Sequence, residues 1–153
     1  MANTFSQIYL QFVFAVQNRC SLIKEEWKNE LYKYIAGIVQ NNHHKMIVIN
    51  GVADQIHLFI GYKPQQLIPM LLQEVKGCSP KWINERKFVR GKFTWQEGYG
   101  VISYSHSQID AVVKYILNQE QHHKQKNFQE EYRELLIKFN LSFDERYIFQ
   151  EIE

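Results

Sequence analysis

Two short motifs in the sequence combine residue types that can bind a divalent cation and attack a phosphate. The first is Gln55-Ile56-His57, and the second places Tyr115 four residues before Gln119. Oxygen ligands such as a carboxamide suit Mg²⁺ and Mn²⁺, and Mn²⁺ also accepts imidazole. A tyrosine hydroxyl has an ordinary pKa of about 10, so it is a good nucleophile only when another group assists it. A cation that polarises a phosphate is one source of that assistance.

The spacing within each motif brings its side chains together. Gln55 and His57 lie two residues apart in a segment predicted to be a strand, so both side chains share one face, roughly 6–7 Å apart. Tyr115 and Gln119 are at positions i and i+4 of a predicted helix, so they lie on one face about one turn apart. His57 alone would more often be a structural histidine, and Tyr115 alone a core residue. Only the combination indicates a cation site.

The spacing of apolar residues predicts the elements that must position these motifs. Strands are predicted at residues 5–16, 45–50, 55–62 and 93–104, and helices at 24–41, 65–86, 107–123 and 127–139. We expect a hairpin turn at Asn50-Gly51 and a break or kink in the second helix near Gly77 and Pro80. We also expect a loop or bulge at residues 98–100, and a capping box from Ser107 to Asp110.

The first six predicted elements follow the order β-α-β-β-α-β, which is the ferredoxin-like arrangement. This order predicts an α+β fold, in which a four-stranded antiparallel sheet carries two helices on one face and further helices follow at the C-terminal end. Ile56, Leu58 and Ile60 would face the two helices, and Gln55, His57 and Phe59 would lie on the other face. We expect residues 1–153 to form a single domain, with an acidic, aromatic tail at 142–153.

Composition excludes several classes of protein. Of the 153 residues, 45% are apolar and 22% are charged, which is typical of a soluble globular domain. No apolar run reaches the length of a membrane span. The two cysteines, Cys20 and Cys78, form no CxxC pair, which excludes a zinc knuckle and is typical of the reducing cytoplasm. The net charge of +2 gives no argument for nucleic-acid binding by itself.

Together, the motifs resemble the single-tyrosine HUH transposases of small bacterial insertion sequences, the TnpA type, within the superfamily of REP-associated tyrosine transposases. In that family a strand carries His-hydrophobic-His, and a later helix carries a tyrosine with a glutamine four residues on. The matching segments here are QIH at 55–57 and YILNQ at 115–119. Residues 93–99, FTWQEGY, also resemble the family's FxWQxGY stretch. The resemblance extends over about residues 4–140.

The resemblance implies a defined reaction. Tyr115 would be the catalytic residue and would attack a phosphodiester of single-stranded DNA, forming a 5′-phosphotyrosine and releasing a 3′-hydroxyl. Gln55, His57 and Gln119 would hold Mg²⁺ or Mn²⁺, which orients and polarises the scissile phosphate. Rejoining would reverse the step without ATP. The resemblance further implies a homodimer that recognises a DNA hairpin.

One position departs from the family pattern. The first HUH histidine is replaced by Gln55, and Ala53 stands where the pattern has proline. A carboxamide oxygen is a weaker donor than imidazole for Mn²⁺, so we predict weakened metal binding and reduced activity. The alternative function is that of a catalytically inactive relative, which binds nucleic acid as a regulator. A ferredoxin-like metabolic sensor without a DNA role is less favoured.

A basic segment supports DNA binding independently of the net charge. Residues 76–92 include six basic residues and a single acidic one, Glu85. Trp82 and Phe88 lie among them in the sequence. Cations of this kind bind phosphates, and aromatic rings can stack on bases. The alternative is an ordinary solvated helix face. The predicted DNA-binding residues are Lys76, Lys81, Arg86, Lys87, Arg90 and Lys92.

Overall fold

The computed structural model of the chain describes residues 4–121 and 128–138. The predicted tail at 142–153 and the last residues of the helix predicted at 107–123 lie outside this part. The strands are β1 (Tyr9–Ala15), β2 (Lys45–Val52), β3 (Gln55–Gly61) and β4 (Gly100–Tyr104). The α-helices are α1 (Glu25–Asn41), α2 (Ile68–Arg86), α3 (Ile109–Leu117) and α5 (Phe128–Lys138), and two short 3₁₀ helices are η1 (Gln17–Arg19) and η2 (His106–Gln108).

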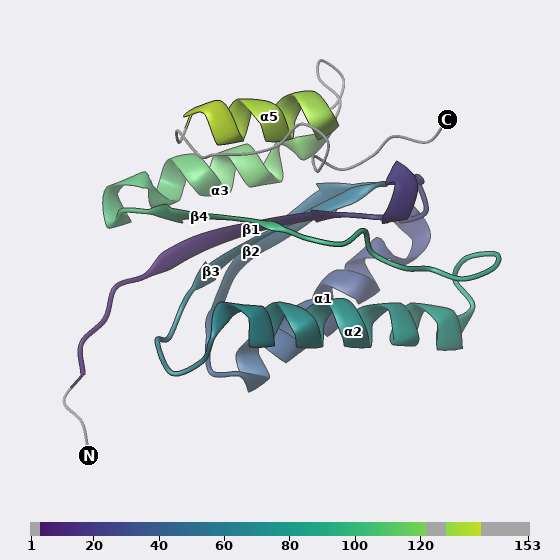
Figure 1. The fold of residues 1–153 in the computed structure, drawn as a ribbon, viewed down its shortest axis with the longest axis horizontal. Coiled ribbons are helices and arrows are strands. Elements are labelled where there is room, and N and C mark those ends of the chain that lie inside the picture. Colours follow the sequence, from purple (N-terminus) through teal and green to yellow (C-terminus); the bar gives the residue numbers. More distant parts are fainter. Residues whose placement is uncertain (1–3, 122–127, 139–153) are drawn as a thin grey trace.

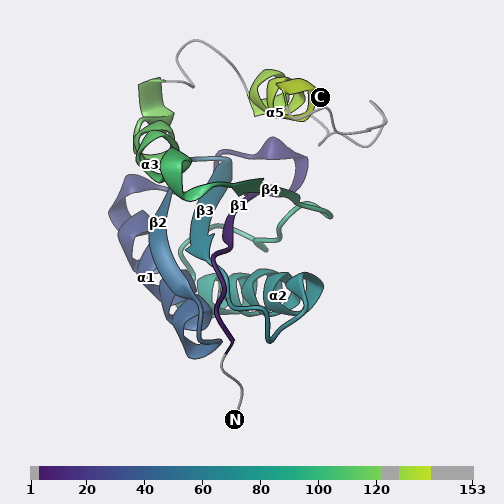
Figure 2. The same cartoon turned by 90° about the vertical axis from the view of Figure 1, so that its left-hand side faces the viewer.

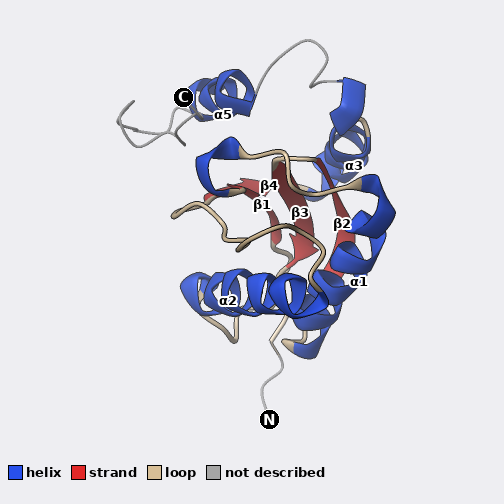
Figure 3. Cartoon of the chain, turned by 90° about the vertical axis from the view of Figure 1, so that its right-hand side faces the viewer, coloured by secondary structure: helices blue, strands red, loops and turns tan. Residues whose placement is uncertain are grey.

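The four strands form one sheet in the order β2-β3-β1-β4, with every neighbouring pair antiparallel. The predicted β-α-β-β-α-β order and the α+β class are confirmed. Helices α1 and α2 cover one face of the sheet, and α3 and α5 cover the other (Figure 1). The two side views show the same layers: α5 and α2 lie on opposite sides of the sheet (Figures 2 and 3).

The main core lies between the sheet and helices α1 and α2. Alternate residues of β1 and β3 point into it, as the period of a strand requires. Their partners on the helices include Leu31 and Ile35 of α1 and Leu71 and Val75 of α2, all fully buried. The strand residues in this core are Leu10, Phe12, Phe14, Ile56, Leu58 and Ile60. The predicted orientation of Ile56, Leu58 and Ile60 is therefore confirmed.

The opposite face of the sheet holds helix α3 in place. Phe59 of β3 packs with Val112 and Ile116 of α3 in a second apolar cluster. Asn50 of β2 fixes the end of this helix, because its side-chain Nδ2 donates to the backbone oxygens of Ile116 at 2.9 Å and of Leu117 at 3.3 Å. The last carbonyls of a helix have no partner within the helix. This contact therefore sets where the residues around the C-terminal end of α3 lie on the sheet.

The predicted turn of the β2–β3 hairpin at Asn50-Gly51 is wrong. The turn lies at residues 53–54, and Gly51 stays within β2, paired with Ile56. A Cβ atom at residue 51 would lie 2.1 Å from the backbone oxygen of Gln55. Glycine is needed here because the two backbones approach too closely for a side chain, and not because a turn requires it.

Replacing Gly51 with alanine is expected to destabilise the fold by about 2–4 kcal/mol, because the new methyl group must push β3 away at Gln55. Chemical denaturation of the purified variants measures this change. Gly37→Ala is the matched control, because a Cβ there meets nothing within 4 Å and alanine favours a helix by about 1 kcal/mol over glycine. Equal midpoints for the two variants would contradict the prediction.

Of the break or kink predicted in the second helix, the break is wrong, because α2 continues through Pro80. A proline inside a helix costs about 3 kcal/mol and leaves a carbonyl without its usual donor. Buried apolar residues on both sides of it, Leu72, Val75 and Ile83, hold the helix against the sheet. The Ser79 hydroxyl donates to the Val75 backbone oxygen at 2.6 Å. Tertiary packing thus outweighs the local signal.

The last strand is shorter than predicted, since only residues 100–104 of the segment 93–104 form β4. Before it, Trp95 forms an isolated antiparallel bridge with Val16, and Gln96 N donates to Ala15 O at 2.8 Å. Phe93 bonds to α2. Phe93 N donates to Asn84 Oδ1 at 2.8 Å, and Asn84 Nδ2 donates to Phe93 O at 3.1 Å. The predicted capping box from Ser107 to Asp110 is wrong. The residues that form it lie two positions earlier, where Ser105 N donates to Gln108 Oε1 at 2.9 Å.

Among the helices that the structure describes, none has the length and hydrophobicity to cross a membrane.

Candidate active site

The structure brings the side chains of both sequence motifs together under α3. Gln55, His57 and Gln119 are each 0% exposed. Gln55 Nε2 donates to Gln119 Oε1 at 2.8 Å and lies 3.0 Å from His57 Nε2. Strand β3 supplies the first two residues, and Gln119 follows the end of α3. Gln55 and His57 lie on the sheet face opposite α1 and α2, as the alternation predicted.

Tyr115 lies beside this group in the same chain. Its ring centroid is 6.0 Å from that of His57, with the rings nearly perpendicular. Burial raises the pKa of Tyr115 above its ordinary value, and the nearby Glu131 carboxylate raises it further. The hydroxyl is therefore protonated near neutral pH, and it donates to Glu131 Oε1.

Glu131 is a site residue that the sequence analysis missed. It comes from the first turn of α5 and is only 5% exposed. Its Oε1 lies 3.6 Å from His57 Nε2 and 3.3 Å from Gln119 Nε2. In the sequence, Glu130 and Glu131 are two adjacent glutamates near the start of a helix, a pattern that usually indicates solvent exposure. No sequence signal separates one from the other.

The Nδ1 atom of His57 contacts a pair of polar side chains, Gln11 and Tyr104, that the sequence analysis did not predict. Gln11 of β1 is fully buried, and its Nε2 lies 2.9 Å from His57 Nδ1. The Tyr104 hydroxyl donates to Gln11 Oε1 at 2.7 Å, and burial raises the pKa of Tyr104 to about 12. Because an amide nitrogen only donates, Nδ1 accepts from Gln11 here. For Nε2 to ligate a metal, the Gln11 amide would have to turn so that its oxygen accepts from Nδ1–H. The sequence does hold a signal for this contact, because Gln11 is a polar residue inside an otherwise apolar strand.

The chemistry of these side chains fits a hard divalent cation. Within residues 4–121 and 128–138, no three His, Cys, Asp or Glu side chains cluster as a metal site. A cation here would therefore take two carboxamides, Gln55 and Gln119, beside the His57 imidazole. Such oxygen-rich sets suit Mg²⁺ and Mn²⁺. Gln55 would ligate through its oxygen, which requires a half-turn of its amide.

The predicted DNA-binding residues lie apart from this group. Most of them are exposed at the C-terminal end of α2 and in the following loop. Helix α2 lies on the side of the sheet away from α3 and α5 (Figure 1). These exposed residues are Lys81, Arg86, Lys87, Arg90 and Lys92, which we call the α2 basic patch.

The two aromatic rings in this segment have partners within the chain. Trp82 stacks on Tyr34 with centroids 4.9 Å apart, and Phe88 stacks on Trp27 at 5.0 Å. Arg86 lies over the Trp82 ring at 5.3 Å. These contacts order the end of α2 and present the guanidinium group of Arg86 on a fixed support.

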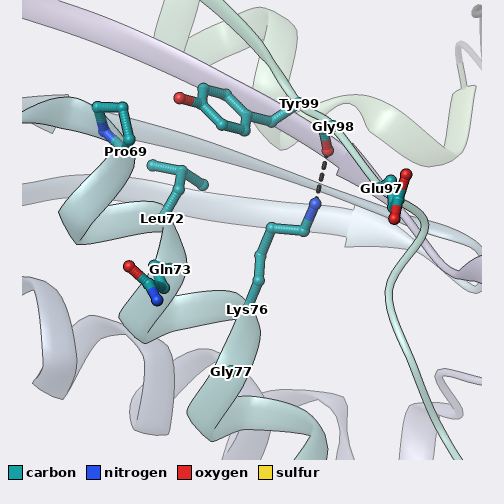
Figure 4. A pocket seen from close by; sticks show the side chains of 8 residues that line it. All are labelled: Pro69, Leu72, Gln73, Lys76, Gly77, Glu97, Gly98 and Tyr99. Carbon is teal, nitrogen blue, oxygen red and sulfur yellow. Dashed lines mark hydrogen bonds between the residues drawn. The ribbon is translucent and has the colours of Figure 1, made fainter.

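Lys76, the sixth predicted residue, is placed differently. It lines a cavity of about 560 Å³ between α2 and residues 97–99, together with Pro69, Leu72, Gln73, Gly77, Glu97, Gly98 and Tyr99 (Figure 4). Its Nζ donates to Gly98 O at 2.6 Å and to Gln96 O at 2.8 Å. Burial lowers the pKa of Lys76 to about 8. Lys76 therefore ties the loop before β4 to α2.

Comparison with known families identifies the chain. The profile of the family described as "Transposase IS200 like" matches residues 4–119, which include both sequence motifs. The chain belongs to the IS200-like transposases. A curated relative, the ISDra2 transposase TnpA of Deinococcus radiodurans, is 25% identical to this IS200-like transposase over 122 residues, which cover 74% of this chain and 84% of the relative.

Two solved structures share the fold of this IS200-like transposase. One is a putative transposase from Deinococcus radiodurans, with a TM-score of 0.62 and 21% identity, covering 78% of this chain and 95% of the other. The second is a REP-associated tyrosine transposase bound to a REP hairpin, with a TM-score of 0.61 and 11% identity, covering 100% of this chain and 98% of the other. At these identities, the likeness establishes the fold.

Proposed function

We propose that this IS200-like transposase cleaves and rejoins single-stranded DNA through Tyr115, with the help of Mg²⁺ or Mn²⁺. The observation that carries the proposal is that Tyr115 lies beside the buried side chains of Gln55, His57 and Gln119 in a single chain. A tyrosine, an imidazole and carboxamides placed together can provide a nucleophile and a cation site.

In the proposed reaction, Tyr115 Oη bonds to phosphorus and loses its proton, while the bond from phosphorus to the 3′-oxygen breaks and that oxygen takes a proton. Because one phosphodiester replaces another, the step needs no ATP. Gln55, His57 and Gln119 would hold the cation, which when bound polarises the scissile phosphate. The packing of α3 on Phe59 and the Asn50 contacts orient Tyr115 toward His57.

We further propose that the substrate contains a DNA hairpin. The REP-associated structural neighbour is bound to such a hairpin, and the exposed α2 basic patch supplies cations for phosphates here. We also propose that the protein acts as a homodimer, as the family resemblance implies. In a single chain, however, Tyr115 already lies beside its own His57, so each subunit holds the groups needed to cut one phosphodiester.

The test is a denaturing gel of the protein with hairpin-bearing single-stranded DNA, labelled at the 5′ or the 3′ end. A covalent adduct that carries the 3′ label, and that forms with Mg²⁺ or Mn²⁺ but not with a chelator, is expected from the native protein. Tight hairpin binding without any adduct would favour the second candidate, a regulator that binds nucleic acid. That candidate is favoured by Gln55, which stands where the family has a metal-binding histidine.

Gln55→His is expected to raise Mn²⁺ affinity by about 10-fold and to speed adduct formation. The physical reason is that imidazole is a stronger donor than a carboxamide to Mn²⁺. The Gln55 side chain is already in place, because its Nε2 lies 3.0 Å from His57 Nε2. Isothermal titration with Mn²⁺ measures the affinity directly. Unchanged affinity would show that Gln55 does not limit cation binding.

A further inference from the structure

Glu131 lies where a ligand of the proposed cation would lie, although no sequence motif includes it. Its Oε1 is 3.6 Å from His57 Nε2. Two ligands of one ion, each about 2.1 Å from it, lie about 3–4 Å from one another. The separation is too long for a hydrogen bond, and it falls within the range expected for two ligands of one ion.

The surroundings of Glu131 give the same indication. A carboxylate is costly to bury unless a charge or strong hydrogen bonds compensate it, and Glu131 is 5% exposed. The Tyr115 hydroxyl and the Gln119 amide contact its Oε1, so this oxygen lies among the groups of the proposed cation site. A divalent cation bound there would interact favourably with the carboxylate charge.

We propose that Glu131 is a carboxylate ligand of the divalent cation and makes up for the imidazole that Gln55 does not provide. This inference rests on the cation site of the proposed function. With Glu131, the ligand set changes from three neutral side chains to a set with one negative charge. Carboxylate count is a main determinant of the affinity of hard cations, so α5 would contribute directly to metal binding.

The proposal is tested by Mn²⁺ titration of the full-length protein without DNA, followed by the electron paramagnetic resonance signal of free Mn²⁺. Glu131→Gln keeps the size of the side chain and removes its charge, and is expected to weaken binding by about 10-fold or more. Glu130→Gln is the matched control, because Glu130 is exposed on the same turn of α5, and is expected to bind within about twofold of the native protein. Circular dichroism checks that each variant is folded.

The double variant Gln55→His/Glu131→Gln sharpens the test. If Glu131 makes up for the missing imidazole, the new histidine should recover most of the affinity that Glu131→Gln loses. His57→Ala separates the inference from the proposed function. Affinity lost in His57→Ala but kept in Glu131→Gln would overturn the role of Glu131 and leave the cation site in place. No saturable Mn²⁺ binding by the native protein would overturn both.

Discussion

Replacing Tyr115 with phenylalanine is expected to reduce the covalent protein–DNA adduct by at least about a thousandfold, to background. The variant removes one oxygen atom, which is the proposed nucleophile, and keeps the ring that packs beside His57. Loss of a nucleophile leaves only the effects of binding and positioning, and these cannot form a covalent bond. A denaturing gel with 3′-labelled hairpin DNA and Mn²⁺ gives the measurement.

Two controls make this result specific. Hairpin affinity of Tyr115→Phe should stay within about twofold of the native protein, because helix α2, which leads into the α2 basic patch, lies on the other side of the sheet from α3 (Figure 1). Tyr104→Phe removes the nearby hydroxyl that contacts Gln11 and should still form an adduct. An adduct that survives Tyr115→Phe and disappears in Tyr104→Phe would assign the attack to Tyr104 and refute the proposal.

Charge reversal in the α2 basic patch is expected to weaken hairpin binding by about 100-fold or more. The triple variant replaces Arg86, Lys87 and Arg90 with glutamate. Each lost phosphate contact lowers the salt dependence of binding by about 0.7 to 0.9 in a plot of log affinity against log salt. Three contacts therefore predict a decrease in slope of about 2 to 3. Fluorescence anisotropy over a range of salt concentrations measures both quantities.

A control with the same change in net charge separates local contact from general repulsion. Lys24, Lys33 and Lys45 are exposed lysines outside the patch, and the reversal of these three should change affinity by much less. Similar losses in the two triple variants would mean that the patch has no special role. In both variants, Mn²⁺ binding should remain unchanged, because none of the replaced residues touches the buried group around His57.

Periodicity was enough to predict the sheet and its two faces. A strand has a period of two, so the pattern around Gln55 and His57 placed both on one face and Ile56 on the other. The errors occurred where tertiary contacts override local signals. Gly51 looks like a turn residue but is required by a close backbone approach, and Pro80 is carried within α2 by packing on both sides.

The candidate site was predictable only where residues fall into a motif. Tyr115 and Gln119 were found from their helical spacing, and the structure places them with Gln55 and His57. Glu131 could not be found, because α5 brings it to the site from a turn rich in glutamate. The role of Lys76 in the fold was not predictable either. Its charge led to a prediction of DNA binding, and the fold adds hydrogen bonds from its ammonium group to the carbonyl oxygens of Gln96 and Gly98.

The burial of Glu131 beside Tyr115 has a consequence for the order in which the partners arrive. If Glu131 is a ligand of the cation as proposed, its carboxylate places a negative charge beside Tyr115 in the metal-free protein, and an approaching phosphodiester is repelled. A bound divalent ion would reverse the local sign and turn this repulsion into attraction. Under the proposal, cation binding would precede engagement of the cleavage site, and cation supply would control commitment to strand breakage.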